Sequence, residues 1–424
     1  DLTAYNFALS AYAKGKQWRK ALELVDDMKQ SGVQPTVVTY TTAMSACTNC
    51  GQSAKSFELF EAMLSDGVEP DLVMYGAAVT ALAQDGRWKR ALELLDEMRA
   101  SNVEPNAGTY NAAIAACNKG GQWERAVDLI KDMSARGIEP DVVSYNSAIA
   151  ACARCRELEK ALELLDDMFR LGKRPDRVTY GSVISACAKC GKWERALQLL
   201  DSLRELGCAP DQIIYSSAIT ACVKGGQPDR ALELFDESRQ KVQPDVILYS
   251  GAISALGGQW ERALELLDEM RQNGIEPNSI TFNAAMSSCE KAGEWQRAVA
   301  MLDDMRQHGI EPDVVSYTVA VTACGKSGEW QLALKLLSEA QNVRADVALY
   351  NAAITACVKA GQWEEAVDIY DRTRQKGIKP DVVTYGVAMA AFAKCGQWQR
   401  AVDLLEDMRK DHIEPNINAY NAAI

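Results

Sequence analysis

A unit of about 35 residues recurs along the whole chain of 424 residues, and this periodicity limits the possible folds more than any other feature. A tyrosine returns every 33 to 35 residues from Tyr5 to Tyr420, with Phe282 as the one exception. Eleven of the twelve prolines share one position of the unit, and all nine tryptophans share another. If the tyrosine is numbered position 4, the tryptophan falls at position 17 and the proline at position 34. Such self-similarity is typical of stacked repeats.

Each repeat reads as two short amphipathic helices. After Tyr110, apolar residues recur with the i, i+3, i+4, i+7 spacing of one helix face. Two glycines then break the chain, and a second apolar pattern begins at Trp123. Gly137 and the proline that follows it end the second helix, and Asp141 is well placed to cap the next one. The tryptophans open the second helix, so we expect them to belong to the core between helices.

Because a single helix pair cannot bury both apolar faces, the repeats must stack. The sequence therefore predicts an all-α, right-handed superhelical α-solenoid of tandem helix-turn-helix repeats, with no other domain. The chain starts at Asp1, the last position of a repeat, and ends inside a first helix, so we expect an excerpt of a longer array. The predicted repeats span residues 2–36, 37–71, 72–106, 107–141, 142–176, 177–211, 212–245, 246–278, 279–313, 314–346, 347–381 and 382–416, with a partial repeat at 417–424.

Composition excludes some classes of protein. A hydrophobic fraction of 48% is too high for a disordered chain. The longest apolar runs are too short to cross a bilayer, so no membrane insertion is expected. The formal net charge of −12 at first argues against a nucleic-acid partner.

Sorting the charges by position reverses that argument. Positions 5 to 14 of all repeats contain two acidic residues, Asp85 and Glu290, whereas acidic residues crowd the second helix. A single lysine near the end of a helix usually compensates the helix dipole. A row of basic residues in register on an acid-poor surface instead predicts phosphate binding. This basic row at position 13 consists of Lys14, Lys119, Arg154, Lys189, Lys224, Lys291, Lys326, Lys359 and Lys394.

The repeat resembles the pentatricopeptide unit, in its plain (P-type) class of uniform repeats. The segments Val142-Val-Ser-Tyr-Asn-Ser-Ala-Ile149 and Gly309-Ile-Glu-Pro-Asp313 look like the two ends of that unit, and the resemblance covers essentially the whole chain. The tetratricopeptide signature W-x2-L-G-x2-Y is missing from the first helix. The resemblance implies a sequence-selective binder of single-stranded RNA, reading one base per repeat. It also implies a mitochondrial or chloroplast location, a role in RNA processing, stability or translation, and other proteins of an organellar ribonucleoprotein as further partners.

In that family, the residues at positions 5 and 35 choose the base. Position 5 varies here within a small set of polar or tiny residues, and position 35 differs between acceptor-only and donor-capable groups. The alternative is that position 35 only caps a helix and that position 5 is a small packing site. Position 5 holds Asn6, Thr41, Gly76, Asn111, Asn146, Gly181, Ser216, Ser250, Asn283, Thr318, Asn351 and Gly386. Position 35 holds Thr36, Asp71, Asn106, Asp141, Asp176, Asp211, Asp245, Asn278, Asp313, Asp346, Asp381 and Asn416.

By the family's pattern, Thr or Ser with Asp favours G, Ser with Asn favours A, and Asn with Asp favours U. The three glycine repeats depart from the commonest pairs and are assigned A, G and A in chain order, and the first repeat is assigned a pyrimidine. With the N-terminus at the 5′ end, the resulting target is 5′-YGAUUGGAUGUA-3′.

Position 2 is apolar in ten repeats. The resemblance implies that these side chains sandwich the bases, and the alternative is packing of the first helix. The residues are Val38, Val73, Val143, Val178, Ile213, Ile247, Ile280, Val315, Val383 and Ile417.

Other motifs that suggest chemistry have structural explanations. Three Cys-x-x-Cys pairs resemble metal or redox half-sites, but eight cysteines share position 11, a small buried site that suits cysteine. No metal, cofactor or catalytic group is therefore predicted, and the protein is not expected to be an enzyme. The rival hypothesis is a protein-binding scaffold, such as a structural subunit of an organellar ribosome.

Overall fold

The computed structural model describes residues 2–340, 345–415 and 419–420, and these residues form 24 α-helices without any strand. Odd-numbered helices are the first helices of the repeats, and even-numbered helices are the second. The first helices are α1 (Leu2–Lys14), α3 (Val37–Asn49), α5 (Leu72–Asp85), α7 (Ala107–Lys119), α9 (Val142–Cys155), α11 (Arg177–Cys190), α13 (Gln212–Lys224), α15 (Val246–Ala255), α17 (Ser279–Ala292), α19 (Val314–Lys326), α21 (Val347–Lys359) and α23 (Val382–Lys394). The second helices are α2 (Trp18–Gln30), α4 (Ser53–Ser65), α6 (Trp88–Ala100), α8 (Trp123–Ala135), α10 (Leu158–Arg170), α12 (Trp193–Glu205), α14 (Pro228–Lys241), α16 (Trp260–Gln272), α18 (Trp295–Gln307), α20 (Trp330–Glu339), α22 (Trp363–Gln375) and α24 (Trp398–Lys410).

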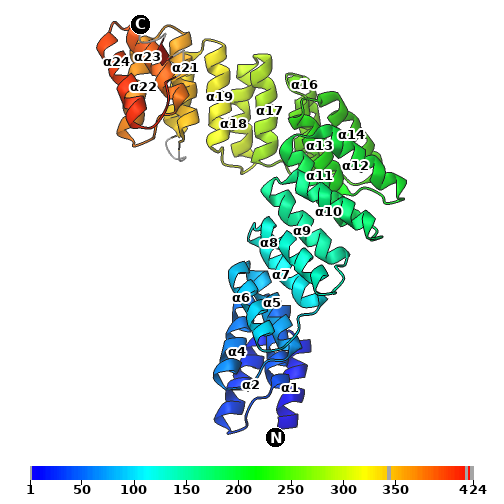
Figure 1. The fold of residues 1–424 in the computed structure, drawn as a ribbon. Coiled ribbons are helices and arrows are strands. Elements are labelled where there is room, and N and C mark those ends of the chain that lie inside the picture. Colours follow the sequence, from blue (N-terminus) through cyan, green and yellow to red (C-terminus); the bar gives the residue numbers. More distant parts are fainter. Residues whose placement is uncertain (1, 341–344, 416–418, 421–424) are drawn as a thin grey trace. The chain divides into compact units, whose positions relative to one another are not determined.

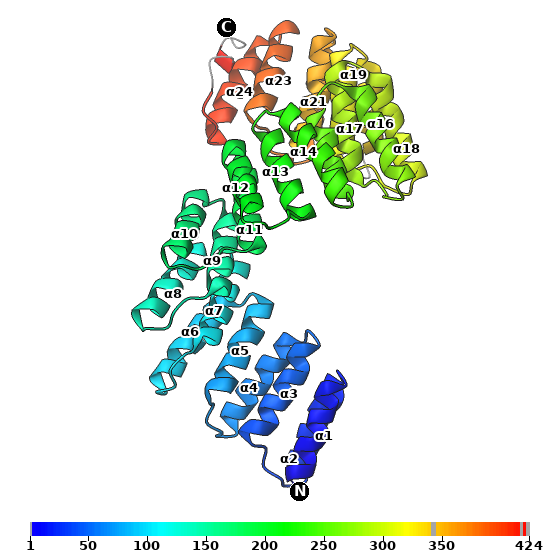
Figure 2. The same cartoon turned by 90° about the vertical axis from the view of Figure 1, so that its right-hand side faces the viewer.

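The chain packs as two compact segments, residues 1–221 and 222–424. Within the first segment, α1, α3, α5, α7, α9 and α11 contact one another in series (Figure 1). Each even-numbered helix from α2 to α10 packs against the odd-numbered helix on either side of it, and α12 packs against α11. The second segment repeats this arrangement from α15 to α23, as the second view shows (Figure 2). The predicted all-α repeat solenoid is confirmed, while the handedness of its superhelix and the absence of another domain stay predictions. Among the described residues, no helix combines the length and apolar character that a membrane span requires.

Local chemistry sets the ends of the helices. Position 35 is the N-cap of the following first helix, as predicted for Asp141. After most second helices a glycine such as Gly137 takes a positive φ, here 74°, which ends the helix at little steric cost. The one proline outside position 34, Pro228, starts α14, where its missing N–H loses nothing.

The core lies between the two layers of helices. The tyrosines at position 4 from Tyr40 to Tyr385 are buried. The Tyr110 hydroxyl group donates to Asp132 of its own repeat at 2.7 Å and accepts from Arg99 of the preceding repeat at 2.8 Å. The tryptophans lie at the margin of this core, and the Trp88 ring packs against Gly120 at the end of the next first helix. Eight of them are half-buried and Trp398 is 67% exposed, because position 17 starts the second helix at the edge of the repeat.

Close approach of two helices makes one glycine essential to the packing. A Cβ added to Gly325 of α19 would lie 2.7 Å from Ala356 Cβ and 3.0 Å from Ala356 Cα of α21. We expect Gly325→Ala to lower the free energy of unfolding by about 1–2 kcal/mol, because overpacking outweighs the gain in helix propensity. The measurement is urea unfolding followed by circular dichroism.

Gly386→Ala is the matched control, because nothing lies within 4 Å of a Cβ added to this glycine of α23. It should raise the free energy of unfolding by up to about 1 kcal/mol. Equal effects of the two substitutions would contradict the close approach of α19 and α21.

Candidate nucleic-acid interface

The odd-numbered helices present an exposed apolar row. The nine described residues at position 2 that were predicted to sandwich bases are 50–68% exposed: Val38, Val73, Val143, Val178, Ile213, Ile247, Ile280, Val315 and Val383. Ile417 lies outside the described residues. Side chains this exposed do not pack the core, so the packing alternative for position 2 is wrong. Their contact with bases stays a prediction.

Position 35 caps helices in both segments. At each Asp and Asn of the described repeats, a side-chain oxygen accepts the backbone N–H three residues later, at 2.8–3.0 Å. Asn416 lies outside the described residues. Position 35 therefore does cap a helix. Capping does not exclude contact with a ligand, because a carboxylate that caps a helix through one oxygen can offer its other oxygen to a ligand.

Where position 5 is asparagine and position 35 is aspartate, the structure brings the two residues together. The Nδ2 atoms of Asn111, Asn146, Asn283 and Asn351 donate to the carboxylates of Asp141, Asp176, Asp313 and Asp381, at 3.0–3.3 Å. Each pair joins the two residues assigned to the same base. Reading of a base by these residues stays a prediction.

These four carboxylates share the same electrostatic environment. Burial by itself would raise the pKa of Asp141, but the Ser144 backbone N–H, the Ser144 hydroxyl and the Asn111 amide together lower it below its ordinary value. The pKa values of Asp176, Asp313 and Asp381 are lowered in the same way. The carboxylates are therefore charged acceptors at neutral pH.

A third residue of the site was not identified from the sequence. The hydroxyl group at position 3 of the following repeat bonds the asparagine oxygen, as Ser144 does to Asn111 Oδ1 at 2.5 Å and Thr179 to Asn146 Oδ1 at 2.6 Å. Position 3 changes between Ser or Thr and a larger apolar residue along the chain. A comparison of position 3 with position 5 of the preceding repeat could have identified this residue from the sequence.

The other residues at position 5 behave differently. The Thr41 and Thr318 hydroxyl groups donate back to carbonyls of their own helices at 2.7 Å, and Ser216 does so at 3.0 Å. Ser250 is buried, at 8% exposed, and within the asparagine group Asn351 is buried as well, at 9%. A base could therefore reach these two positions only after a local side-chain movement.

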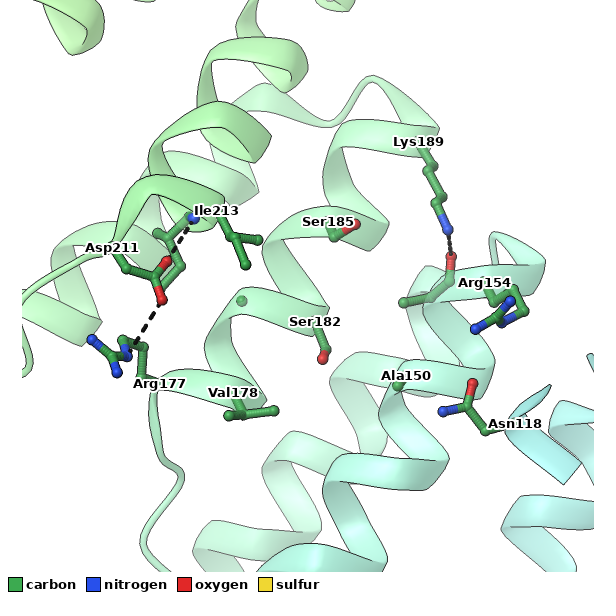
Figure 3. Close-up of a pocket in the computed structure, with 13 residues that line it drawn as sticks. Asn118, Ala150, Arg154, Arg177, Val178, Ser182, Ser185, Lys189, Asp211 and Ile213 are labelled. Carbon is green, nitrogen blue, oxygen red and sulfur yellow. Dashed lines mark hydrogen bonds and ion pairs between the residues drawn. The ribbon is translucent and has the colours of Figure 1, made fainter. Parts of the chain in front are cut away.

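A cavity of about 590 Å³ shows how the predicted positions lie together (Figure 3). Val178 and Asp211 lie at one end, while Arg154 and Lys189 lie at the other. Position 5 of this repeat is Gly181, which has no side chain to fill the space. Asp211 accepts the Ile214 N–H at 3.0 Å and pairs with Arg177 at 3.4 Å. Asp211 with its partner Arg177 at one end and the cations Arg154 and Lys189 at the other suit a nucleotide, with its base and its phosphate respectively.

The second segment has a smaller cavity, of about 300 Å³, in the same register. It is lined by Thr318 and Asn351 at position 5, Asp381 at position 35, and Lys326 and Lys359 at position 13. The predicted positions thus meet in both segments.

The basic row is exposed except for Lys189, which is half-buried. Lys119 and Lys189 donate to backbone carbonyls of the preceding first helix, at Gln84 (2.6 Å) and Ala153 (2.9 Å). Lys326 pairs with Glu290 at 2.5 Å. Dipole compensation is therefore part of the role of this row. An ammonium group has three donors, so a carbonyl contact leaves others for a phosphate.

The cysteines at position 11 are fully buried and unsuited to chemistry. Burial raises the pKa of these thiols to about 11, and that of Cys152 to about 12. Within the described part of the chain, no three His, Cys, Asp or Glu side chains are grouped to hold a metal ion.

Comparison with protein-family models gives matches along nearly the whole chain. The PPR repeat family matches residues 1–49, 35–83, 277–326, 345–394 and 382–424, and the pentacotripeptide-repeat region of PRORP matches residues 72–212. The pentatricopeptide repeat domain matches residues 233–292, and the PPR repeat matches residues 213–241 and 315–342. Comparison with curated proteins gives no match.

Solved structures share the fold. The pentatricopeptide repeat protein PPR10 from maize is 23% identical, with a TM-score of 0.57, over 99% of this chain and 80% of that chain. PPR10 in complex with an 18-nt psaJ RNA element is 20% identical, with a TM-score of 0.47, over 100% and 80%. The PPR domain of Arabidopsis thaliana protein-only RNase P 1 in complex with tRNA is 18% identical, with a TM-score of 0.37, over 45% and 98%. At these identities, the likeness to the maize protein concerns the fold alone.

Proposed function

Because this chain belongs to the pentatricopeptide repeat family, we propose that it binds single-stranded RNA along the surface formed by its odd-numbered helices. The observation that carries the proposal is the common register of three different groups. Exposed apolar side chains recur at position 2 along both segments, and each of the two cavities joins an aspartate at position 35 to two cations at position 13. RNA offers a matching set of partners in base faces, base edges and phosphates.

The proposal includes one base per repeat and the target 5′-YGAUUGGAUGUA-3′. In this assignment, the pairs Thr41/Asp71, Ser216/Asp245 and Thr318/Asp346 read G, and the four asparagine–aspartate pairs read U. The acceptor-only carboxylate suits the N–H groups of guanine, while the asparagine amide adds a donor for uracil.

The chain would act by occupying RNA, with no catalytic step of its own. A bound array blocks nucleases or remodels a leader sequence, which would serve RNA processing, stability or translation in a mitochondrion or chloroplast. Other proteins of an organellar ribonucleoprotein would then be additional partners.

The test is fluorescence anisotropy with a labelled 12-nucleotide RNA of the proposed sequence and its single-base variants. We expect G-to-A changes at the second and tenth bases each to weaken binding about tenfold, because adenine lacks the N1–H and N2–H donors of guanine that the aspartate carboxylate would accept. An RNA of the same composition in scrambled order is the control. Equal binding of all these RNAs would contradict base reading, and no binding of any of them would favour the protein-scaffold hypothesis.

A further inference from the structure

The hydroxyl group at position 3 of the following repeat has a defined place in the asparagine-type sites. Ser144, Thr179, Ser316 and Thr384 are all 0% exposed, although they are polar. Their oxygens accept the backbone N–H of the capping aspartate, at 3.0–3.2 Å. A buried hydroxyl group must also place its single proton, and two oxygen acceptors lie near it in every site.

The shorter contact is to the asparagine. The hydroxyl oxygen lies 2.5–2.8 Å from the asparagine Oδ1 and 2.8–3.0 Å from the aspartate Oδ1, and the asparagine is nearer in every site. The hydroxyl group thus donates to the amide oxygen, while the amide Nδ2 donates to the carboxylate. A flipped amide would place two acceptors, its own oxygen and the carboxylate, against each other.

This arrangement fixes which group the asparagine offers to a ligand. The hydroxyl group uses one lone pair of its oxygen and the carboxylate uses one of its N–H groups, so the second N–H is the donor that remains for a ligand. A donor selects an acceptor on the base edge. The uracil assigned to these four repeats carries two carbonyl acceptors.

Where position 35 is aspartate, the identity of position 3 follows the identity of position 5; where position 35 is asparagine, Thr109 follows Gly76 and Thr281 follows Ser250. Every asparagine at position 5 is followed by Ser or Thr at position 3 of the next repeat, including Asn6, which accepts from Thr39 at 2.9 Å. Every repeat that combines Thr, Ser or Gly at position 5 with Asp at position 35 is followed by an apolar residue. These residues are Met74, Ile214, Leu248 and Leu349.

We propose that position 3 of the following repeat is a third specificity-determining position of each site, acting through the residue at position 5. A hydroxyl group there holds asparagine as a donor toward the base. In repeats with aspartate at position 35, an apolar residue there accompanies a position 5 without an amide, so that the carboxylate faces the base as an acceptor with no amide between them. The inference rests on the proposed RNA binding and adds the residue that positions the reading group.

Thr179→Val tests the proposal, because valine has nearly the shape of threonine and position 3 accepts larger apolar residues in other repeats. We expect the preference for U over G at the fifth base to fall roughly fivefold, as one fixing hydrogen bond is lost. Thr179→Ser should retain the preference. The fourth base, read by Asn111 with Ser144 unchanged, is the internal control and should keep its preference in every variant.

The reverse experiment creates the site in a threonine repeat. We expect Thr318→Asn together with Leu349→Thr to change the preferred tenth base from G to U. Thr318→Asn alone should favour U about fivefold less, because the new amide has no hydroxyl group to hold it. Thermal unfolding of each variant separates this effect from a change in stability.

The outcomes separate the two proposals. If the unchanged protein does not prefer U over G at the fifth base, the proposed function fails at that repeat. A second set of results would overturn the inference on position 3 alone. In that set, the unchanged protein prefers U, Thr179→Val keeps the full preference, and the single and double variants at the tenth base behave alike.

Discussion

Replacing Lys119, Arg154 and Lys189 together by glutamine is expected to weaken RNA binding about 100-fold at ~0.1 M salt. These residues occupy position 13 of three consecutive repeats in the first segment, and Arg154 and Lys189 line the larger cavity. Each phosphate contact on a single strand contributes a slope of ~0.7 to the dependence of log K on log salt, so three contacts correspond to ~2 decades at this salt. With nine cations, the unchanged protein should show a slope near ~−6 and the variant a slope near ~−4.

The control removes the same charge from the other layer of helices. Lys131, Lys160 and Arg195 lie on α8, α10 and α12, the partners of the helices that carry the first three residues. Their replacement by glutamine changes the net charge equally but should leave the slope within ~0.5 of the original. Similar slopes for the two triple variants would show that RNA responds to overall charge and would contradict a phosphate path along position 13. Binding isotherms at four or more salt concentrations give the slopes.

The fold could be predicted from the sequence because each repeat presents the same local signals many times. Tyr110, Trp123 and Gly137 each have counterparts at the same position in most repeats, so a chance pattern in one repeat could not mislead. The tryptophans show the limit of this reasoning. A large apolar residue at helical spacing suggests the core, but the sequence does not show that position 17 lies at the edge of the repeat.

The candidate site could be predicted only in part, for a similar reason. Positions 5 and 35 were identified because they vary in polarity while their neighbours do not, and the structure places Asn146 beside Asp176. Position 3 was missed because Thr179 and Ile214 both look like ordinary buried residues in a sequence. The difference between them depends on a hydrogen bond across two repeats, 33 residues apart for Thr179 and Asn146. Spacing along one helix cannot show such a contact.

Position 2 gives the other large expected effect. Val178→Asp together with Ile213→Asp should weaken RNA binding about 1,000-fold without lowering the melting temperature. Both side chains line the larger cavity and are 60% and 68% exposed. A new carboxylate repels a phosphate by roughly 2 kcal/mol across ~8 Å at an effective dielectric constant of ~20, and two such changes make roughly 4 kcal/mol. The fold should not suffer, because both residues lie in the first turn of a helix, where a negative charge is favourable.

Phe169→Asp with Leu171→Asp is the matched control, because these residues are 50% and 55% exposed at the end of α10, outside the odd-numbered helices. The control pair adds the same charge and removes a similar apolar area, so its RNA affinity should change less than about threefold at ~0.15 M salt. Differential scanning fluorimetry and fluorescence anisotropy on the same samples separate a loss of stability from a loss of RNA affinity. A large drop in melting temperature for the Val178 and Ile213 variant would mean that its weaker RNA binding reflects a loss of the fold. Equal losses of affinity in the two variants would mean that RNA does not lie along the apolar row. If a base lies between Val178 and Ile213, only the Val178 and Ile213 variant should lose RNA affinity, and its melting temperature should not change.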